Sequence, residues 1–252
     1  MIIYFLIFIF GMVIGSFLNV CIYRLPKDES IIMPVSHCPK CNNHIKPYDN
    51  IPVISYFILH GKCRACGTKI SPQYPLVEIL TGVLFLSLYY YNSLSLDFVL
   101  NSILISGLII SAFIDIDYKI IPDSITLPLI IFFITISFGR YLISNNLNFV
   151  IDSFLGMLLG GGFLFLIAII WRGGMGGGDI KLAALIGSAI GWKMVILVLF
   201  LSFIIGAVSG IILILSGKKT RKDVIPFGPF LCLGAFISIF WGKIIIYWYC
   251  QK

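Results

Sequence analysis

Charged side chains are scarce in this sequence. They make up 12% of its 252 residues, whereas 59% are hydrophobic and the mean hydropathy is +1.03. A soluble domain could not bury that much apolar surface, but a lipid bilayer is itself an apolar solvent. The shortage of charge therefore excludes a soluble enzyme and predicts a polytopic membrane protein. The formal net charge of +7 could suggest a nucleic-acid partner, yet the positions of the basic residues explain it better, and we expect no nucleic-acid binding.

The first residues also lack the features of a removable signal peptide. Residues 1–23 contain no basic n-region and no small-residue cleavage site before Arg24, so we expect them to remain as a first span. The sequence contains no convincing internal repeat and no low-complexity tract, and its only sizeable polar stretch is residues 24–74. We therefore predict three parts: a first transmembrane helix at 1–23, a cytosolic loop at 24–74 and a transmembrane core at 75–252.

Long apolar runs take up most of the remaining chain. A crossing needs about 20 residues, and runs of this kind begin near residues 1, 76, 98, 124, 150, 180, 194 and 225. The sequence therefore predicts an all-α polytopic membrane protein with about eight transmembrane helices. The sixth run, from Ile180 to about Ile190, is short for a full crossing, so this helix is either tilted or partly buried among its neighbours.

Basic residues are concentrated on one side of the predicted bundle. If the N-terminus is placed outside, the loops on the opposite side are 24–74, 115–123, 172–181 and 217–223. These loops contain fourteen of the eighteen Lys and Arg residues: Arg24, Lys27, Lys40, Lys46, Lys62, Arg64, Lys69, Lys119, Arg172, Lys181, Lys218, Lys219, Arg221 and Lys222. The other four are Arg140, Lys193, Lys243 and Lys252. Because cytoplasmic loops carry an excess of Lys and Arg, the four basic loops are predicted to face the cytosol.

Four of the seven cysteines form two Cys-x-x-Cys pairs, separated by twenty-one residues. The pairs are Cys38 with Cys41 and Cys63 with Cys66, and Gly67 permits the tight backbone that such turns need. Four thiolates would complete a tetrahedral shell, so we expect a closed, structural zinc site. Disulfides or a redox motif are alternatives, and the predicted cytosolic position argues against both.

The remaining cysteines and the histidines have simpler interpretations. His37, His44 and His60 lie near the cysteine pairs, but four sulfurs already complete the metal shell, so we interpret these histidines as ordinary loop residues. Cys21, Cys232 and Cys250 fall in apolar runs. We expect them to be small buried hydrophobic residues.

Two acidic residues lie where apolar runs meet the predicted cytosolic interface. Asp115 follows the run 103–114, and Asp179 lies sixty-four positions later, just before the run that begins at Ile180. Carboxylates at the ends of long apolar segments are costly to desolvate and mark functional sites. Two carboxylates brought close together share one proton, so that one can activate water while the other binds a carbonyl. We therefore expect Asp115 and Asp179 to form a pair that cuts a peptide bond without a metal.

Other interpretations of these acids stay open. Each could lie in a water-filled loop, and Asp179 could be the N-cap of the helix beginning at Ile180. A small transporter could carry protons on Asp115, Asp117 and Asp179, although transporter sites tend to lie near the bilayer midplane between related halves. A third alternative is a non-enzymatic scaffold that presents a zinc knuckle to a partner, which leaves the acidic pair unexplained.

Three further acids are secondary candidates. Asp117 lies two residues beyond Asp115, and Asp123 is expected to be a helix cap or to face water. Glu78 lies just inside the second span, and we expect it to pair with a basic loop residue or to support a second site.

Glycines recur at helical spacing in three places. They are Gly156 with Gly160, Gly161 and Gly162, Gly187 with Gly191, and Gly206 with Gly210. In lipid, such notches let helices approach closely. We expect tight packing within one chain, with dimerisation as a minor alternative.

A series of short motifs runs through nearly the whole chain. They are Gly15-Ser16-Phe17-Leu18-Asn19-Val20, Arg24-Leu25-Pro26, Cys38-Pro39-x-Cys41, Asn50-Ile51-Pro52, Gly61-x-Cys63-x-x-Cys66, Tyr74-Pro75-x-x-Glu78, Asp115 with Ile121-Pro122-Asp123, Gly176-Gly177-Gly178-Asp179, and Pro226-Phe227-Gly228-Pro229. In this order they resemble the type IV prepilin peptidases, which are GxGD-type membrane aspartic proteases. The family pattern places its first catalytic aspartate seven residues before the Ile-Pro proline, which is Asp115 here. Its second is the aspartate of Gly-x-Gly-Asp, which is Asp179.

The resemblance implies a substrate and a second activity. A member of this family removes a short basic leader, after a glycine, from type IV prepilins or pseudopilins at the cytosolic face of the bacterial cytoplasmic membrane. It then methylates the new N-terminus with S-adenosylmethionine, in the service of type IV pili or protein secretion. Members without the cysteine loop look like peptidases without methylation, so the loop favours the bifunctional form, with Glu78 as a candidate participant. The residues that bind the methyl donor are not identified, because the chain lacks the glycine fingerprint of a nucleotide-binding fold.

Overall fold

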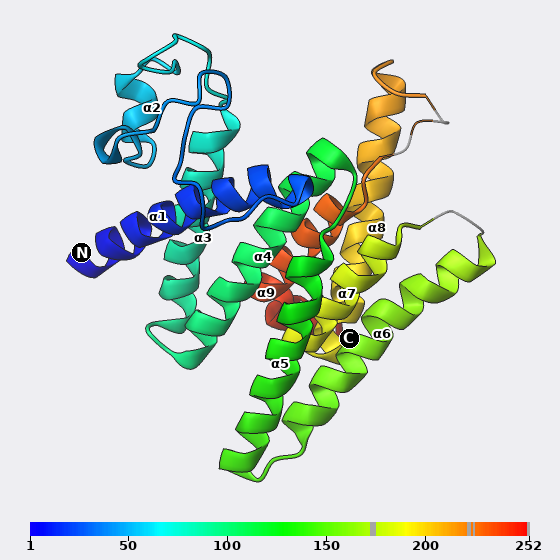
Figure 1. Ribbon diagram of the computed structural model, residues 1–252. Coiled ribbons are helices and arrows are strands. Elements are labelled where there is room, and N and C mark those ends of the chain that lie inside the picture. Colours follow the sequence, from blue (N-terminus) through cyan, green and yellow to red (C-terminus); the bar gives the residue numbers. More distant parts are fainter. Residues whose placement is uncertain (172–174, 221–222, 224, 251–252) are drawn as a thin grey trace. The chain divides into compact units, whose positions relative to one another are not determined.

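The computed structural model describes residues 1–171, 175–220, 223 and 225–250. In this part of the chain the regular structure is helical, and two compact units are distinguished, Met1–Ile110 and Ser111–Lys252. Figure 1 shows the helices, of which α4 runs through the boundary between the units. Four basic residues used in the topology prediction lie outside the described residues: Arg172, Arg221, Lys222 and Lys252.

Two crossing helices form the framework of the first unit. α1 (Ile2–Arg24) packs against α3 (Gln73–Asn92), and glycines bring their backbones together. A methyl group built on Gly11 would lie 2.8 Å from the Cα atom of Gly82, which is too close for any other residue. Small residues at such crossings are how helices associate in lipid, where the hydrophobic effect does not drive them together. α4 (Leu96–Tyr118) begins in the same unit.

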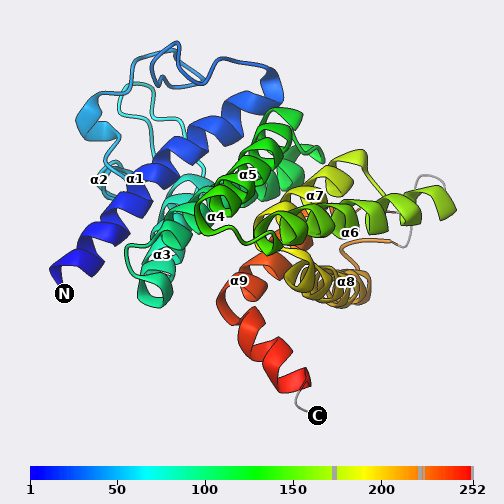
Figure 2. The same cartoon turned by 90° about the horizontal axis from the view of Figure 1, so that it is seen from below.

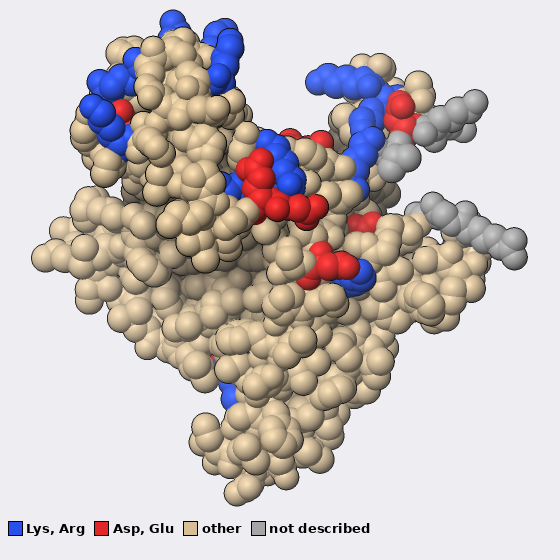
Figure 3. Space-filling view, in the orientation of Figure 1, with Lys and Arg blue, Asp and Glu red and all other residues tan. Residues whose placement is uncertain are grey.

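The segment between α1 and α3 forms the cysteine loop, residues 25–72. It contains three short helices: η1 (Leu25–Lys27), η2 (Pro47–Asp49) and α2 (Ile54–Ile58). Lys and Arg side chains gather over this loop in Figure 3, whereas the helices mostly present uncharged side chains. This is the distribution expected of a polar loop attached to helices that lie in lipid.

The second unit contains the end of α4 and five further helices in its described residues: α5 (Asp123–Ser144), α6 (Asn148–Ile170), α7 (Gly177–Ile190), α8 (Trp192–Leu215) and α9 (Gly228–Cys250). α7 contacts all four of the others, and its Leu182, Leu185 and Ile186 are fully buried. Figures 1 and 2 both show α7 lying beside α6. The core of this unit is therefore built around its shortest helix.

The helices confirm the predicted class, and each of the eight predicted runs begins within three residues of the start of a helix. Seven of the described helices, α1, α3, α4, α5, α6, α8 and α9, are long and apolar enough to cross a membrane. α7 has 14 residues, so it is too short to cross alone and is buried among its neighbours, one of the two arrangements expected for the sixth run. A short helix at membrane depth is tolerated where protein surrounds it.

Tight packing within the chain is confirmed at several of the predicted glycines, but not at Gly162, where a methyl group would meet nothing within 4 Å. A methyl group on Gly156 would overlap the carbonyl oxygen of Gly187, and one on Gly160 would overlap that of Ala183. Gly206 lies against the ring of Phe230. The α6–α7 crossing therefore has no room for a side chain at Gly156 or Gly160, and the contact of Gly206 with Phe230 joins α8 to α9.

Candidate active site and metal site

Asp115 lies in the last turn of α4 and is buried, with 5% of its surface exposed. Its Oδ2 atom accepts a hydrogen bond of 3.0 Å from the backbone N–H of Gly228, the first residue of α9. A methyl group on Gly228 would lie 2.6 Å from the same oxygen. The carboxylate thus lies directly against the backbone of α9 at its N-terminus, where the free N–H groups and the helix dipole favour negative charge.

Asp179 is the third residue of α7, and Gly176 is the N-cap residue. The interpretation of Asp179 as an N-cap is wrong, because the helix starts at Gly177 and not at Ile180. Its carboxylate instead turns back and accepts the backbone N–H of Gly176, as the third residue does in a capping box. Asp179 is half-buried, so water can reach it.

Ile121 lies between the helix ends that carry these contacts. A methyl group on Gly178 would lie 2.9 Å from the Cβ atom of Ile121, and one on Gly228 would lie 3.1 Å from its Cδ1 atom. Ile121 is itself buried. The N-terminal turns of α7 and α9 therefore meet on one side chain, six residues after Asp115.

These contacts bring Asp115 and Asp179 into one cluster. The two carboxylates interact electrostatically with each other, and the buried Cys232 of α9 interacts with both. Two carboxylates within a few ångströms of each other cannot both ionise cheaply, and such pairs share one proton. Such a pair can supply a base and an acid to the same reaction.

Asp117 and Asp123 lie outside this cluster. Asp117 is exposed, so we do not assign it as the base or the acid of the pair. Asp123 is the first residue of α5 and faces water, as predicted, while the N-cap position is taken by Pro122. Both oxygens of Asp123 lie 2.7 Å from Nζ of Lys181, a contact that joins the N-terminal turns of α5 and α7.

The four predicted metal ligands also come together. The Sγ atoms of Cys38, Cys41, Cys63 and Cys66 all lie within 4.8 Å of one another, and those of Cys38 and Cys66 are 3.8 Å apart. Zinc–sulfur bonds of about 2.3 Å in a tetrahedron require sulfurs about 3.8 Å apart. The site therefore fits a four-coordinate metal ion after only small adjustments. Among the described residues, this cluster consists of the four cysteines, and His37, His44 and His60 are not part of it.

The two knuckles have the same backbone. In the first, the amide of Asn42 bonds to the carbonyl of Cys38 at 2.9 Å; in the second, the amide of Gly67 bonds to that of Cys63 at 2.9 Å. Asn42 and Gly67 both have left-handed φ angles, of 55° and 69°. Gly67 plays the predicted role, and Asn, which tolerates this conformation best among the other residues, fills the matching position.

The pKa of one thiol in the cluster favours metal binding. Hydrogen bonds from the hydroxyl and the backbone of Thr68 lower the pKa of Cys66 to about 6. Metal ions bind the thiolate form. This cysteine therefore gives up its proton at little cost when an ion binds.

Glu78 has different partners from those expected. Its Oε2 atom accepts the backbone N–H of Val53 at 2.7 Å, and its carboxylate also hydrogen-bonds to Ser16. Neither partner in the described structure is basic, so the expected pairing with a basic loop residue is wrong. Glu78 is buried, with 7% of its surface exposed.

Two family models match most of the chain. The Bacterial Peptidase A24 N-terminal domain matches residues 9–92, and the Type IV leader peptidase family matches residues 102–211. A protein of Bacillus subtilis (strain 168) named "Prepilin leader peptidase/N-methyltransferase" is 39% identical over 98% of this chain and 97% of its own length. This chain belongs to the type IV leader peptidase family.

Other members are similarly close and bear the same printed name. The Aeromonas hydrophila protein is 36% identical over 97% of this chain and 92% of its own, and that of Pseudomonas aeruginosa is 32% identical over 96% and 91%. No solved structure matches the chain. The transporter alternative is not supported by these relatives. Asp115 and Asp179 fall within the part matched by the leader peptidase model, and the four cysteines and Glu78 fall within the part matched by the N-terminal model.

Ile121, Gly228 and Cys232 were not predicted to be part of the site. Ile121 and Gly228 belong to the motifs Ile121-Pro122-Asp123 and Pro226-Phe227-Gly228-Pro229, which carried the resemblance without giving either residue a role. Cys232 looks in sequence like any other apolar residue. Only the packing of the helices shows that they surround the two acids.

Proposed function

We propose that this protein is a membrane aspartic endopeptidase. It removes the basic leader peptide from type IV prepilins or pseudopilins and then methylates the new N-terminus. The observation that carries the proposal is the meeting of Asp115 and Asp179, which come from different helices, in one cluster at the N-terminal turns of α7 and α9. The names of the relatives supply the substrate and the second activity.

In the proposed reaction, the ionised member of the pair takes a proton from a water molecule. The resulting oxygen attacks the scissile carbonyl, while the protonated member donates a hydrogen bond to the carbonyl oxygen. The tetrahedral intermediate collapses when the leaving amine receives a proton from the pair, and the C–N bond breaks. The N–H of Gly228 occupies Oδ2 of Asp115, so Oδ1 would be the oxygen that acts on water or substrate.

We propose that the enzyme lies in the cytoplasmic membrane of a bacterium, with the active site and the cysteine loop facing the cytosol. Fourteen of the eighteen basic residues fall in the loops on that side, as the positive-inside rule requires. The apolar segment of the substrate would remain in the bilayer beside the enzyme, so that its leader reaches the pair at the interface.

The metal is proposed to be zinc with a structural role. Four thiolates leave no open position for a substrate or a water molecule. Cys38, Cys41, Cys63 and Cys66 would hold the ion and tie the two knuckles together. Each knuckle contains one isolated backbone pairing of its own, His37 with His44 in the first and Lys62 with Lys69 in the second.

The methyl donor is proposed to be S-adenosylmethionine, which would supply an electrophilic methyl group. A hollow of about 420 Å³ in the cysteine loop is lined by Tyr56, Lys62, Lys69 and Ser71, among others. The lysines could pair with the donor's carboxylate and the tyrosine could stack on its base. The lining contains no acidic side chain for the donor's ammonium and sulfonium groups, however, so the hollow does not fit the whole donor.

The test is incubation of the purified, detergent-solubilised protein with a prepilin and S-adenosylmethionine, with the product read by mass. The proposal predicts a pilin shortened by its leader and heavier by one methyl group. A Cys38→Ser/Cys41→Ser variant should lose its metal and its methylation while cleavage persists. An intact prepilin after incubation with the wild-type protein would reject the proposal.

A further inference from the structure

Val53 has the most unusual backbone in the cysteine loop. Its φ and ψ angles are 61° and −50°, and the amide of Ile54 bonds to the carbonyl of Pro52 at 2.6 Å. This is a γ-turn of the positive-φ kind, which is rare and strained. A β-branched residue at its centre adds to the strain. Such strain persists only where the surroundings impose it, and it concentrates at functional sites.

The contacts that impose this strain come from the hairpin formed by α1 and α3. The N–H of Val53 donates to the carboxylate of Glu78, at 2.7 Å, and Glu78 lies in the first part of α3. At this point α1 presses against α3, since a methyl group on Gly15 would lie 2.7 Å from the Cα atom of Glu78. The acid is therefore fixed between two helices, with Ser16 of α1 as its second partner.

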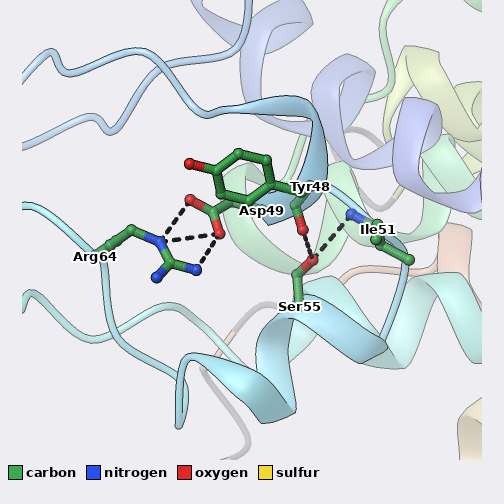
Figure 4. A network of polar contacts seen from close by, with 5 residues as sticks. All are labelled: Tyr48, Asp49, Ile51, Ser55 and Arg64. Atoms are coloured by element: carbon green, nitrogen blue, oxygen red, sulfur yellow. Dashed lines mark hydrogen bonds and ion pairs between the residues drawn. The ribbon is translucent and has the colours of Figure 1, made fainter.

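The other side of the turn is tied to the metal site. Ser55 is buried and joins the two ends of the turn segment: it accepts the N–H of Ile51 and donates to the carbonyl of Tyr48, both at 3.0 Å. The next residue, Asp49, binds Arg64 with contacts of 2.6 to 3.1 Å. Figure 4 shows this network. Arg64 lies between two metal-binding cysteines, so the contacts run from the second knuckle to the buried acid.

The ends of the loop are fixed separately by α1. Arg24 is buried and donates to the carbonyls of Ser30 and Pro34, at 2.8 and 2.6 Å. Asn19 donates to the carbonyl of Tyr74 at 3.0 Å. Glu78 therefore holds the middle of the loop, which neither of these contacts reaches.

The two acids proposed for cleavage and Glu78 fall in different units of the chain. Asp115 and Asp179 belong to the second unit, and neither is part of the first. Among the described residues of the first unit, Glu78 is the only buried carboxylate. A contact that fixes the loop in the first unit is thus separate from the machinery of cleavage.

We propose that Glu78 is a positioning residue for methylation: by holding the strained turn at Val53, it fixes the cysteine loop on the α1–α3 hairpin. The proposal rests on the proposed function, because it divides the two activities between two sites. The carboxylate acts by accepting the N–H of Val53, and the metal-bound knuckle braces the same segment through Arg64 and Asp49. Cleavage does not depend on this contact.

The test measures cleavage and methylation by mass in the same incubation, with the full-length protein, a prepilin and S-adenosylmethionine. Glu78→Met removes the acceptor, and it should lower the methylation rate about tenfold or more, the order expected for loss of one buried hydrogen bond to a charged group. Cleavage should stay within about twofold, since the pair in the second unit is untouched. Glu78→Gln keeps an oxygen acceptor, so it should retain most of the methylation.

A rescue experiment separates positioning from general damage. Glycine adopts positive φ without strain, so Val53→Gly should let the turn form without the carboxylate. The double variant Glu78→Met/Val53→Gly should therefore recover much of the methylation lost in Glu78→Met. The matched control, Glu78→Met/Val53→Ala, should not recover it, because alanine is still disfavoured at positive φ.

Three results would overturn the inference. One is a Glu78→Met protein that methylates like the wild type. Another is a parallel loss of cleavage and methylation, which would indicate a folding defect. The third is equal loss in Glu78→Gln and Glu78→Met without rescue by glycine, which would show that the charge of Glu78 matters and the turn does not. A wild-type protein that neither cleaves nor methylates would instead reject the proposed function.

Discussion

The contact between Asp115 and the first residue of α9 gives a sharp prediction for Gly228→Ala. The added methyl group would lie 2.6 Å from Oδ2 of Asp115, and ordinary contact begins near 3.4 Å. The carboxylate must therefore retreat by roughly 0.8 Å, away from the N–H that it now accepts. Misplacement of a reacting group by about 1 Å costs on the order of 100-fold in rate. We expect kcat for leader cleavage to fall by about this factor, which equals about 2.7 kcal/mol of barrier.

The assay is the initial rate of leader cleavage over a range of prepilin concentrations in detergent. KM should change little, because Gly228 is packed against Asp115 and Ile121 and is expected to affect the reacting group more than substrate binding. Gly162→Ala is the matched control: a methyl group there meets nothing within 4 Å, so this variant should cleave like the wild type. Wild-type kcat in Gly228→Ala would refute the reasoning, since Asp115 would then not be held against α9.

Three further predictions concern the framework around the sites. Gly187→Ala should lower the thermal unfolding midpoint by an amount equivalent to about 1–3 kcal/mol, because its methyl group would overlap the carbonyl of Gly156; an unchanged midpoint would contradict the packing of α6 on α7. Treatment with a chelator should speed proteolysis of residues 24–74 while cleavage of the prepilin continues, and unaltered proteolysis would argue against a structural metal. Lys181→Met breaks the ion pair with Asp123, whose side chains are 40% and 55% exposed. The loss of stability should be no more than about 1 kcal/mol in denaturant titrations. A much larger loss would show that the pair does more than join two helix ends.

The long helices could be predicted from sequence because their signal is local and lasts for a whole crossing. The start of α7 was missed by three residues, since Gly177 and Gly178 were interpreted as loop. Glycine is a poor helix former, yet at Gly178 it is required by the approach of Ile121. The same shift moved Asp179 from the expected cap to the third helical position.

The metal ligands were predictable for a similar reason. The spacing of Cys38, Cys41, Cys63 and Cys66 is a local pattern that is typical of a four-cysteine metal site. The surroundings of the acids were not predictable in this way. Contacts such as Gly228 with Asp115 join residues 113 positions apart, and no periodic pattern records which helices pack together. The turn at Val53 contradicts its own residue preference, so local reasoning could only have missed it.

The central claim is that Asp115 and Asp179 act together as one proton-sharing unit. The most direct measurement is leader cleavage by Asp115→Asn, Asp179→Asn and the double variant, each confirmed to be folded, beside Asp117→Asn as the control from the exposed face of α4. The account predicts that each single variant loses cleavage as completely as the double variant does, while Asp117→Asn keeps it. Substantial cleavage by either single variant would contradict the account.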